Sequence, residues 1–317
     1  MKEQSHIVLC LLVMGPFVSL GCDGSCSCSE VRKHTTPAKA SIEMPMDTKS
    51  LALSVLKGIE MGDFETVVGW FQDPPVWHEA GLLGVKGTSN REWLIERLVG
   101  LGRLLSGGRL VAETVIAIRD TVATVYVIET RKGKRTARTK GLLVLRFGFD
   151  KVTSATSYVN PRMILVQQGY ISGPAPVVAE PPESPAVVEG DASFPEEFET
   201  AVFAAYEALS AGYPQPFQGL LGDGCKVVDY LTGFQGVGGD AVIQSLGMVT
   251  MTKAKKIQFR RKASIKAKEY LLIEWDIAIK GTPYDALSRA DLFKIEDARI
   301  QELTIFGNAT QLFGLEL

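Results

Sequence analysis

The first half of the chain shows hydrophobic patterns that predict helices and then strands. Asp47 can cap a helix whose apolar residues recur at i, i+4 and i+8 until Gly62, and Asp63 can cap a second, short helix. Ser89 and Glu92 form a capping-box motif that begins a third helix. Runs rich in Val, Ile, Thr and Tyr then predict four strands, over 109–118, 121–130, 139–147 and 151–159.

The second half repeats this order of elements. Its pattern predicts a helix over 195–211, a short helix near 215–222 and a third helix capped by Asp240. Strands are predicted near 255–266, 268–280, 285–295 and 299–307. Three helices followed by a run of strands indicate an α+β fold, with helices packed on one face of an antiparallel sheet in each half.

The two halves also share residues in register. The stretch "WHEAGLLGVKGTSNREWL" from Trp77 aligns without a gap on "DYLTGFQGVGGDAVIQSL" from Asp229, under a constant shift of 152 residues. The alignment, extended one residue back to Val76, matches three glycines and two valines. We interpret this as one structural unit used twice.

Length and composition agree with two units. A chain of 317 residues of which 46% are apolar can bury two ordinary cores. Residues 171–193 contain five prolines and no basic residue, which predicts an extended linker. We therefore expect a first domain over 47–170 and a second over 194–317, called here the first and second repeat.

The N-terminus indicates export. Residues 1–21 include fifteen consecutive uncharged residues, which is the length of a signal peptide and short for a membrane span. They end in "VSLGC", which resembles a bacterial lipobox and implies lipidation of Cys22, although Ser19 stands where leucine is preferred. The alternative is an ordinary secretory signal cut near Gly21, giving a periplasmic or secreted protein. Residues 22–46 would form a flexible tether, and the choice between inner and outer membrane stays open.

The net charge and the motifs present in the sequence limit the partners and cofactors that can be expected. The net charge of −2 gives no field that would recruit nucleic acid. Two basic stretches, 131–140 and 253–268, are interpreted as solvated faces, the first at a hairpin turn; contact with anionic lipid or polymer is the alternative. Three histidines and no CxxC pair predict no metal, and no phosphate-binding motif or other cofactor signature is present.

The cysteines indicate no particular pairing. If Cys22 carries a lipid, then Cys26, Cys28 and Cys225 remain, an odd number whose spacing dictates no disulfide. Cys225 is interpreted as a small core residue.

Four motifs carry a resemblance to a known superfamily. They are "GDFETVVGWFQDPPVWHE" and "LRFGFDKVTSATSYVNP" in the first repeat, and "VVDYLTGFQGVGG" and "DLFKIEDARIQELTIFGN" in the second. Both repeats resemble the nuclear-transport-factor-2-like superfamily, in its SnoaL-like branch of polyketide cyclases and ketosteroid-isomerase relatives. The resemblance implies two cone-shaped units, each with three helices on a curved antiparallel sheet and an apolar interior that holds a small apolar molecule. It also implies that the cones pair through their sheets as an internal pseudo-dimer.

The resemblance further suggests acid-base residues in the second repeat. Isomerases of this kind combine a carboxylate base with a tyrosine and a protonated aspartic acid that form an oxyanion hole. The segment "DLFKI" puts Asp291 at the acid position, Tyr206 lies within one residue of the tyrosine position, and Asp229 or Tyr230 falls near the base. The structural alternatives are a strand-end salt bridge for Asp291, an ordinary core position for Tyr206 and a solvent-facing Asp229.

The first repeat is less complete. Leu143 occupies the place of Asp291, and His78 falls near the base position, where a neutral imidazole could accept a proton. A hydrogen-bonded cavity wall is the alternative for His78. Trp77, Tyr230 and Trp275 are the candidate ligand-binding residues, with core packing as their alternative.

The sequence therefore leaves two functions open. The first hypothesis is a non-catalytic, envelope-anchored module that binds a small apolar ligand or a protein partner. The alternative is an isomerase- or cyclase-type enzyme centred on the acid-base residues of the second repeat.

Overall fold

The computed structural model describes residues 47–80, 90–104, 108–133, 135–190, 194–250, 257–279 and 287–308. The expected signal peptide, Cys22, Cys26, Cys28 and the tether lie outside these ranges, as do Ser89 and the glycines of the first aligned stretch. No helix within the described ranges combines the length and the apolar character that a membrane crossing requires.

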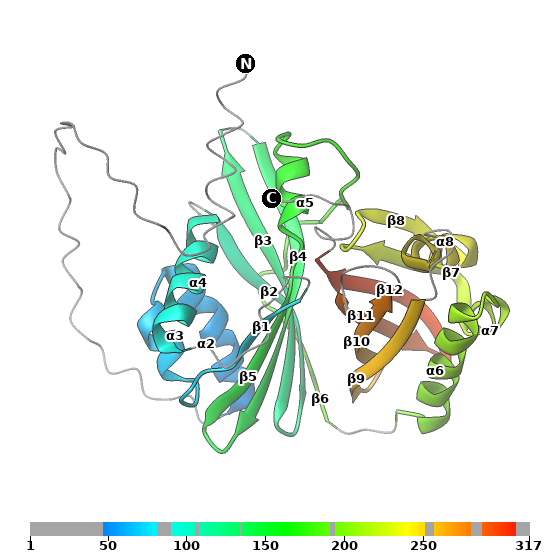
Figure 1. Ribbon diagram of the computed structural model, residues 1–317, viewed down its shortest axis with the longest axis horizontal. Helices are drawn as coiled ribbons and strands as arrows, with labels where there is room; N and C mark the ends of the chain where they lie inside the picture. The colour runs from blue at the N-terminus through cyan, green and yellow to red at the C-terminus, as the bar shows by residue number, and fades with distance from the viewer. Residues whose placement is uncertain are drawn as a thin grey trace. The chain divides into compact units, whose positions relative to one another are not determined.

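The first repeat combines the helices α2, α3, α4 and α5 with a six-stranded sheet (Figure 1). Asp47 caps α2, accepting hydrogen bonds from the backbone of Lys49 and Ser50, and Gly62 ends it in the left-handed conformation (φ 75°), as predicted. Asn90 caps α4 through the backbone N–H of Trp93, so the cap is one residue later than the predicted Ser89. The elements are α2 (Thr48–Met61), α3 (Phe64–Gly69), β1 (Trp77–Glu79), α4 (Arg91–Leu104), β2 (Arg109–Ile118), β3 (Thr121–Lys132), β4 (Arg135–Gly148), β5 (Lys151–Tyr158), α5 (Pro161–Gln167) and β6 (Ala186–Glu189).

The second repeat has the same order of elements up to its last strand, except for the additional strand β8, and no counterparts of α5 and β6 are described in it. Its elements are α6 (Glu196–Ser210), α7 (Gln215–Gln218), β7 (Leu221–Asp229), β8 (Phe234–Val237), α8 (Gly239–Thr250), β9 (Ile257–Ala267), β10 (Tyr270–Ile279), β11 (Leu287–Glu296) and β12 (Arg299–Gly307). Strand order is β1-β5-β4-β3-β2-β6 in the first sheet and β8-β7-β12-β11-β10-β9 in the second. Apart from β6 and β8, the two orders correspond strand for strand, which confirms the predicted α+β class.

Both sheets are mixed, which corrects the expectation of antiparallel sheets. β1 runs parallel to β5, and β7 runs parallel to β12 at the matching place. The end of the predicted linker also joins the first sheet, because β6 pairs in parallel with β2. A proline-rich segment can do this at a sheet edge, where one side of its backbone needs no partner.

Strand pairing fixes the equivalence of the repeats more finely than the sequence alignment. Bulges fall at Arg146/Phe147 and at Lys294/Ile295, so β4 and β11 correspond under a shift of 148 residues. On the preceding strands the shift is 150, because Glu79 pairs with Ser157 as Asp229 pairs with Ile305. The constant shift of 152 is therefore wrong for β1 and β7, whereas the predicted match of Leu143 with Asp291, a shift of 148, agrees with the strand pairing.

Each repeat has its own apolar core between helices and sheet. In the first, α2 buries Leu51, Val55 and Ile59 against strands β2 to β5. In the second, α6 buries Val202 and Tyr206 against the facing strands. These helices show the predicted spacing because residues three and four apart lie on one helix face.

Candidate functional site

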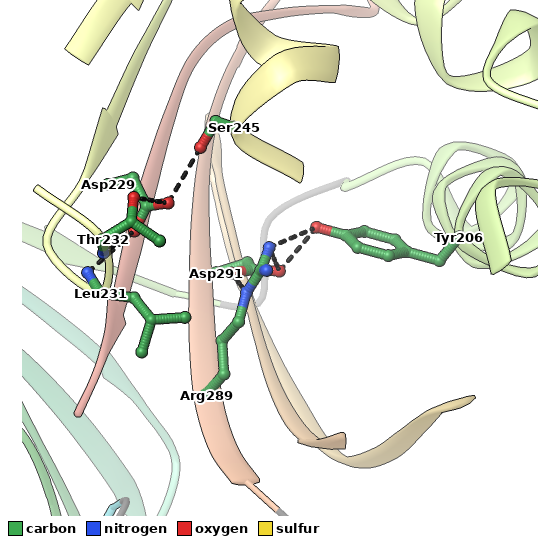
Figure 2. A network of polar contacts seen from close by, with 7 residues as sticks. All are labelled: Tyr206, Asp229, Leu231, Thr232, Ser245, Arg289 and Asp291. Atoms are coloured by element: carbon green, nitrogen blue, oxygen red, sulfur yellow. Dashed lines mark hydrogen bonds and ion pairs between the residues drawn. The ribbon is translucent and has the colours of Figure 1, made fainter. Parts of the chain in front are cut away.

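The core of the second repeat contains a buried polar centre. The Tyr206 hydroxyl, from α6, donates a hydrogen bond to Asp291 Oδ2 at 2.6 Å. Arg289 precedes Asp291 by two residues on β11, so both side chains lie on the same face of the sheet. Arg289 donates from Nε to Asp291 Oδ1 at 2.5 Å and from Nη2 to Asp291 Oδ2 at 2.8 Å. Figure 2 shows the guanidinium beside both partners, and both charged side chains are fully buried.

Electrostatics keep Arg289 charged and Tyr206 neutral. Burial alone would lower the pKa of the Arg289 guanidinium, but the charge of Asp291, acting together with Tyr206, the hydrogen bonds to Asp291 and the charge of Asp229, offsets that effect, so the pKa lies above its usual value. Burial and the charge of Asp291 together raise the pKa of Tyr206 well above the usual tyrosine range. Tyr206 is therefore a neutral donor. Asp291 accepts three hydrogen bonds from two residues, whereas an oxyanion hole of the expected type needs a neutral carboxylic acid that donates.

Asp229 ties a turn to a helix. Its Oδ1 accepts from the backbone N–H groups of Leu231 and Thr232 at 2.8 and 3.0 Å. Its Oδ2 accepts from the hydroxyls of Thr232 and of Ser245 on α8 at 2.7 and 3.0 Å (Figure 2). Burial raises the pKa of Asp229, while the charge of Arg289 and these hydrogen bonds act against that rise. Each oxygen already has two partners, which is the arrangement of a structural carboxylate.

A pocket of about 500 Å³ lies beside Tyr206. It is lined by Phe203, Tyr206, Glu207 and Ser210 of α6, residues 258–261 of β9, and Trp275 of β10. The aromatic rings contact one another: the Tyr206 ring centroid is 4.6 Å from that of Trp275 and 4.9 Å from that of Phe259. The lining includes Tyr206 but neither Asp229 nor Asp291, so the pocket reaches the hydroxyl-bearing residue and not the carboxylates.

Two buried donors in this repeat lack an acceptor among the described residues. They are Arg289 Nη1 and Trp275 Nε1. Buried polar groups without a partner are uncommon in folded proteins, and they call for an explanation. Here both are N–H donors, and one belongs to a residue that lines the pocket.

The first repeat has no such centre at the matching place. Gly141 and Leu143 correspond to Arg289 and Asp291 under the shift of 148 residues. The ring of Tyr126 covers Gly141 so closely that a Cβ there would lie 2.5 Å from Tyr126 Cζ. Burial raises the pKa of Tyr126 to about 12, so its hydroxyl is neutral. A neutral aromatic ring fills the space that charged groups fill in the second repeat.

The base position of the first repeat belongs to Glu79 rather than to His78. Glu79 is the strand equivalent of Asp229, and Arg97 of α4 donates to it from Nε at 3.1 Å. His78 is half-buried and lies between Trp77 and Glu79 on a strand. Strand alternation therefore directs it to the opposite face of the sheet from Trp77, away from the helix-covered core.

The candidate ligand-binding residues separate into two groups. Trp275 lines the pocket. Trp77 is buried in the first core against Phe71, with ring centroids 6.1 Å apart. Tyr230 is buried too, but it stacks on Phe306 in a different cluster, 5.7 Å between centroids. The core-packing alternative describes Trp77 and Tyr230. It describes Trp275 as well, which is 2% exposed in the core of the second repeat while also lining the pocket.

Sequence reasoning missed three residues of this region: Phe259, Arg261 and Arg289. The first two lie in the basic stretch 253–268, which was interpreted as a solvated face, although Phe259 and Arg261 stand two residues apart there and so lie on one face of the strand. The signal for Arg289 was the motif Arg-x-Asp within an apolar strand, because that spacing puts opposite charges on one face.

The described ranges hold no group of three or more His, Cys, Asp or Glu side chains that could bind a metal ion. Cys225 is buried, and burial raises the pKa of its thiol to about 11, so it is present as the unreactive thiol at neutral pH.

No family model and no curated protein matches the chain. Among solved structures, one match is a polyketide cyclase candidate from Sinorhizobium meliloti, with 20% identity and a TM-score of 0.29, over 33% of this chain and 93% of that chain. Another is an NTF2-like protein of unknown function from Cytophaga hutchinsonii, with 13% identity and a TM-score of 0.30, over 37% and 94%. A third is TerC, crystallised with polyporic acid, with 12% identity and a TM-score of 0.33, over 37% and 96%. Two of the three names come from the superfamily that the sequence resembles, and we take no activity from these matches.

Proposed function

We propose that this protein is a non-catalytic binding module that holds a small, mostly apolar ligand in the aromatic pocket of the second repeat. The observation that carries the proposal is the pocket of about 500 Å³ walled by Phe203, Tyr206, Phe259 and Trp275. Small-molecule sites commonly have roughly 300–1,000 Å³ and a mainly apolar or aromatic lining with a few polar groups. The volume and the lining both fit that description.

The neighbouring carboxylates support binding rather than catalysis. A general base needs a free lone pair within reach of the substrate proton. Both oxygens of Asp229 accept two hydrogen bonds each, and Asp291 is held by Arg289 and Tyr206. Neither carboxylate lines the pocket. A reaction here would first have to break these contacts.

Identification of a co-purified molecule tests the proposal. Native mass spectrometry of the purified protein should show an added mass that disappears on denaturation. Ser210→Trp should abolish it, because Ser210 lines the pocket and the indole would occupy the space. Ala204→Trp is the matched control, since Ala204 is exposed on the same helix and does not line the pocket. An added mass that survives Ser210→Trp would argue against this pocket.

An isomerase- or cyclase-type reaction is the competing function, and the 2.6 Å contact between Tyr206 and Asp291 is the observation in its favour. The released ligand separates the two functions. Incubated with the wild-type protein it should be recovered unchanged in mass and chromatographic retention. Conversion that Asp229→Asn or Asp291→Asn abolishes, in a variant that still folds, would establish the enzyme.

We also propose that the protein is anchored in the bacterial cell envelope by a lipid on Cys22, as the lipobox-like sequence suggests. Cys22→Ser should move the protein from the membrane fraction to the soluble fraction. If both forms fractionate alike, the alternative of a plain secretory signal is favoured.

A third proposal concerns the two repeats, which we infer to be an internal pseudo-dimer joined through their sheets. Its support is a set of contacts between them: Tyr158 donates to Glu274 at 2.6 Å, and Asn160 Nδ2 donates to the backbone carbonyls of Tyr230 and Leu231 at 3.0 Å. A cluster of buried apolar residues also draws on both sheets. Asn160→Ala should separate one thermal unfolding transition into two, whereas two transitions in the wild type would contradict the pairing.

A further inference from the structure

Arg261 is the charged side chain that the pocket presents to a ligand. It pairs with Trp275 across strands β9 and β10, and cross-strand partners have their side chains on the same face of a sheet. Its guanidinium carbon lies 4.4 Å from the centre of the Phe203 ring, which belongs to α6 on the other wall. The side chain is 53% exposed. It therefore stands at the pocket mouth, resting on one aromatic wall and open to solvent.

Among the described residues, no acceptor lies close to the guanidinium of Arg261. Its nearest acidic group is Glu199, at 3.6 Å, which is too long for a good hydrogen bond. Glu199 has closer partners, with Lys266 at 2.7 Å and the Ser264 hydroxyl at 2.6 Å. These two hold Glu199 in place, so the guanidinium of Arg261 keeps donors for an incoming group.

The charges of the lining residues also favour an anion. The basic residues of the lining are Arg260 and Arg261, and Glu207 is its one carboxylate. A positive balance of charge complements a ligand that carries a negative charge.

We propose that the ligand is an aromatic or otherwise planar apolar anion, whose rings lie against Phe203 and Phe259, the half-buried rings of the lining, and whose acidic group binds Arg261. Arginine suits this role because its planar guanidinium can stack on a ring and bind a carboxylate or sulfonate with two parallel hydrogen bonds. The inference rests on the proposed function, since it names the class of ligand that the same pocket accepts.

Two fluorescent probes with the same ring skeleton test it. Anilinonaphthalene sulfonate carries a negative charge, and phenylnaphthylamine lacks it. The wild-type protein should bind the anionic probe more tightly. Arg261→Gln should weaken binding of the anionic probe about 10-fold or more, since hydrogen bonds to charged groups contribute roughly 1.5–3 kcal/mol and each 1.4 kcal/mol is tenfold in affinity. Binding of the neutral probe should change less than about twofold.

Lys262→Gln is the matched control. Lys262 is the next basic residue of β9, its ammonium lies 3.7 Å from Asp276 and it does not line the pocket, so neither probe should respond to its loss. Arg261→Lys should recover part of the anionic affinity because it restores the charge without the planar fork. Glu207→Gln should tighten the anionic probe by about two- to threefold, because it removes a repulsive carboxylate at the rim.

The outcomes are distinguishable. If Ser210→Trp abolishes binding of both probes and Arg261→Gln affects the anionic probe alone, the inference stands. If both probes bind equally and Arg261→Gln changes neither, or changes both alike, the anionic ligand class is overturned while a binding pocket remains. If neither probe binds, or if Ser210→Trp leaves both unaffected, the proposed function fails together with the inference. Thermal unfolding of each variant confirms that the comparison is made on folded protein.

Discussion

The two repeats place very different residues at one position of the same fold. In the second, Arg289 and Asp291 form an ion pair inside the core, and in the first Gly141 and Leu143 stand at the matching strand positions. Burying an ion pair carries a desolvation penalty that its attraction often fails to recover, and a well-packed apolar replacement is often as stable. The first repeat demonstrates such a replacement within the same molecule. The fold therefore does not require the polar centre.

The polar centre of the second repeat positions Tyr206. Tyr206 contacts Asp291 on one side and lines the aromatic pocket on the other. Fixing the tyrosine by a charge-assisted hydrogen bond fixes the ring against which Trp275 and Phe259 lie. We infer that the ion pair holds the pocket wall in shape, at some cost in stability.

The largest effect is expected from breaking the ion pair on one side. Arg289→Met leaves Asp291 as an uncompensated buried charge, which should lower the free energy of unfolding by about 3–5 kcal/mol. The double variant Arg289→Met/Asp291→Leu, which is apolar like the first repeat, should recover most of that loss. Urea unfolding followed by circular dichroism measures both. If the double variant is no more stable than the single one, the charges are essential to the fold, and the inference from the first repeat is wrong.

A smaller effect is expected at the position where Glu79 and Asp229 correspond. Asp229→Asn replaces one acceptor oxygen by a donor NH₂ facing hydroxyl and N–H partners, which should cost about 2–3 kcal/mol. Glu79→Gln should cost less than about 1 kcal/mol, because the Glu79–Arg97 pair is partly exposed to water. Equal losses in the two variants, measured by the same unfolding experiment, would show that the repeats use this position alike.

The matched positions of the two repeats also show which features could be predicted from the sequence. Periodicity gave the helices and strands, because each element buries one face, and it gave the α+β class. The register followed only in part. The match of Leu143 with Asp291 was correct, but three shared glycines aligned β1 with β7 by 152 residues where strand pairing requires 150. His78 was consequently proposed in place of Glu79.

Only part of the candidate site was predicted from the sequence. Tyr206 and Asp291 were selected together, and they are in contact. Arg289 was overlooked, because a charged residue in a strand reads as solvent-facing unless its partner two residues away is taken into account. The pocket forms where side chains of α6 contact those of β9 and β10. Because α6 lies far from these strands in the sequence, no local sequence pattern predicts the contact.

The first repeat also contains a buried charged group, and its contribution to stability should depend on pH. Glu129 is 1% exposed and binds Arg138 at 2.8 Å, with Arg109 and Arg131 nearby. The hydrogen bond from Arg138 is the main cause that lowers the pKa of Glu129. A lowered folded-state pKa gives stability that is present at neutral pH and is lost as the pH falls below the ordinary carboxyl range, through the folded-state value.

Glu129→Gln should therefore cost about 2 kcal/mol at pH ~7, and the cost should shrink as the pH falls below the ordinary carboxyl range, because the wild-type carboxylate loses its charge on passing through its lowered folded-state pKa. Urea unfolding over a series of falling pH values measures the change. A cost that does not change with pH would mean that Glu129 contributes by packing rather than by charge.

The smallest effect is expected from the two buried tyrosines. Tyr206→Phe removes a donor from a buried carboxylate that retains Arg289, and should cost about 1.5–2 kcal/mol. Tyr126→Phe removes a neutral hydrogen bond to Ser157 and should cost about 1 kcal/mol or less. The two variants differ more clearly in function: Tyr206→Phe should weaken probe binding at the pocket because its ring loses its anchor, whereas Tyr126→Phe should leave binding unchanged. If Tyr206→Phe binds the probes as the wild type does, the polar centre does not position the pocket wall, and its retention in one repeat needs another cause.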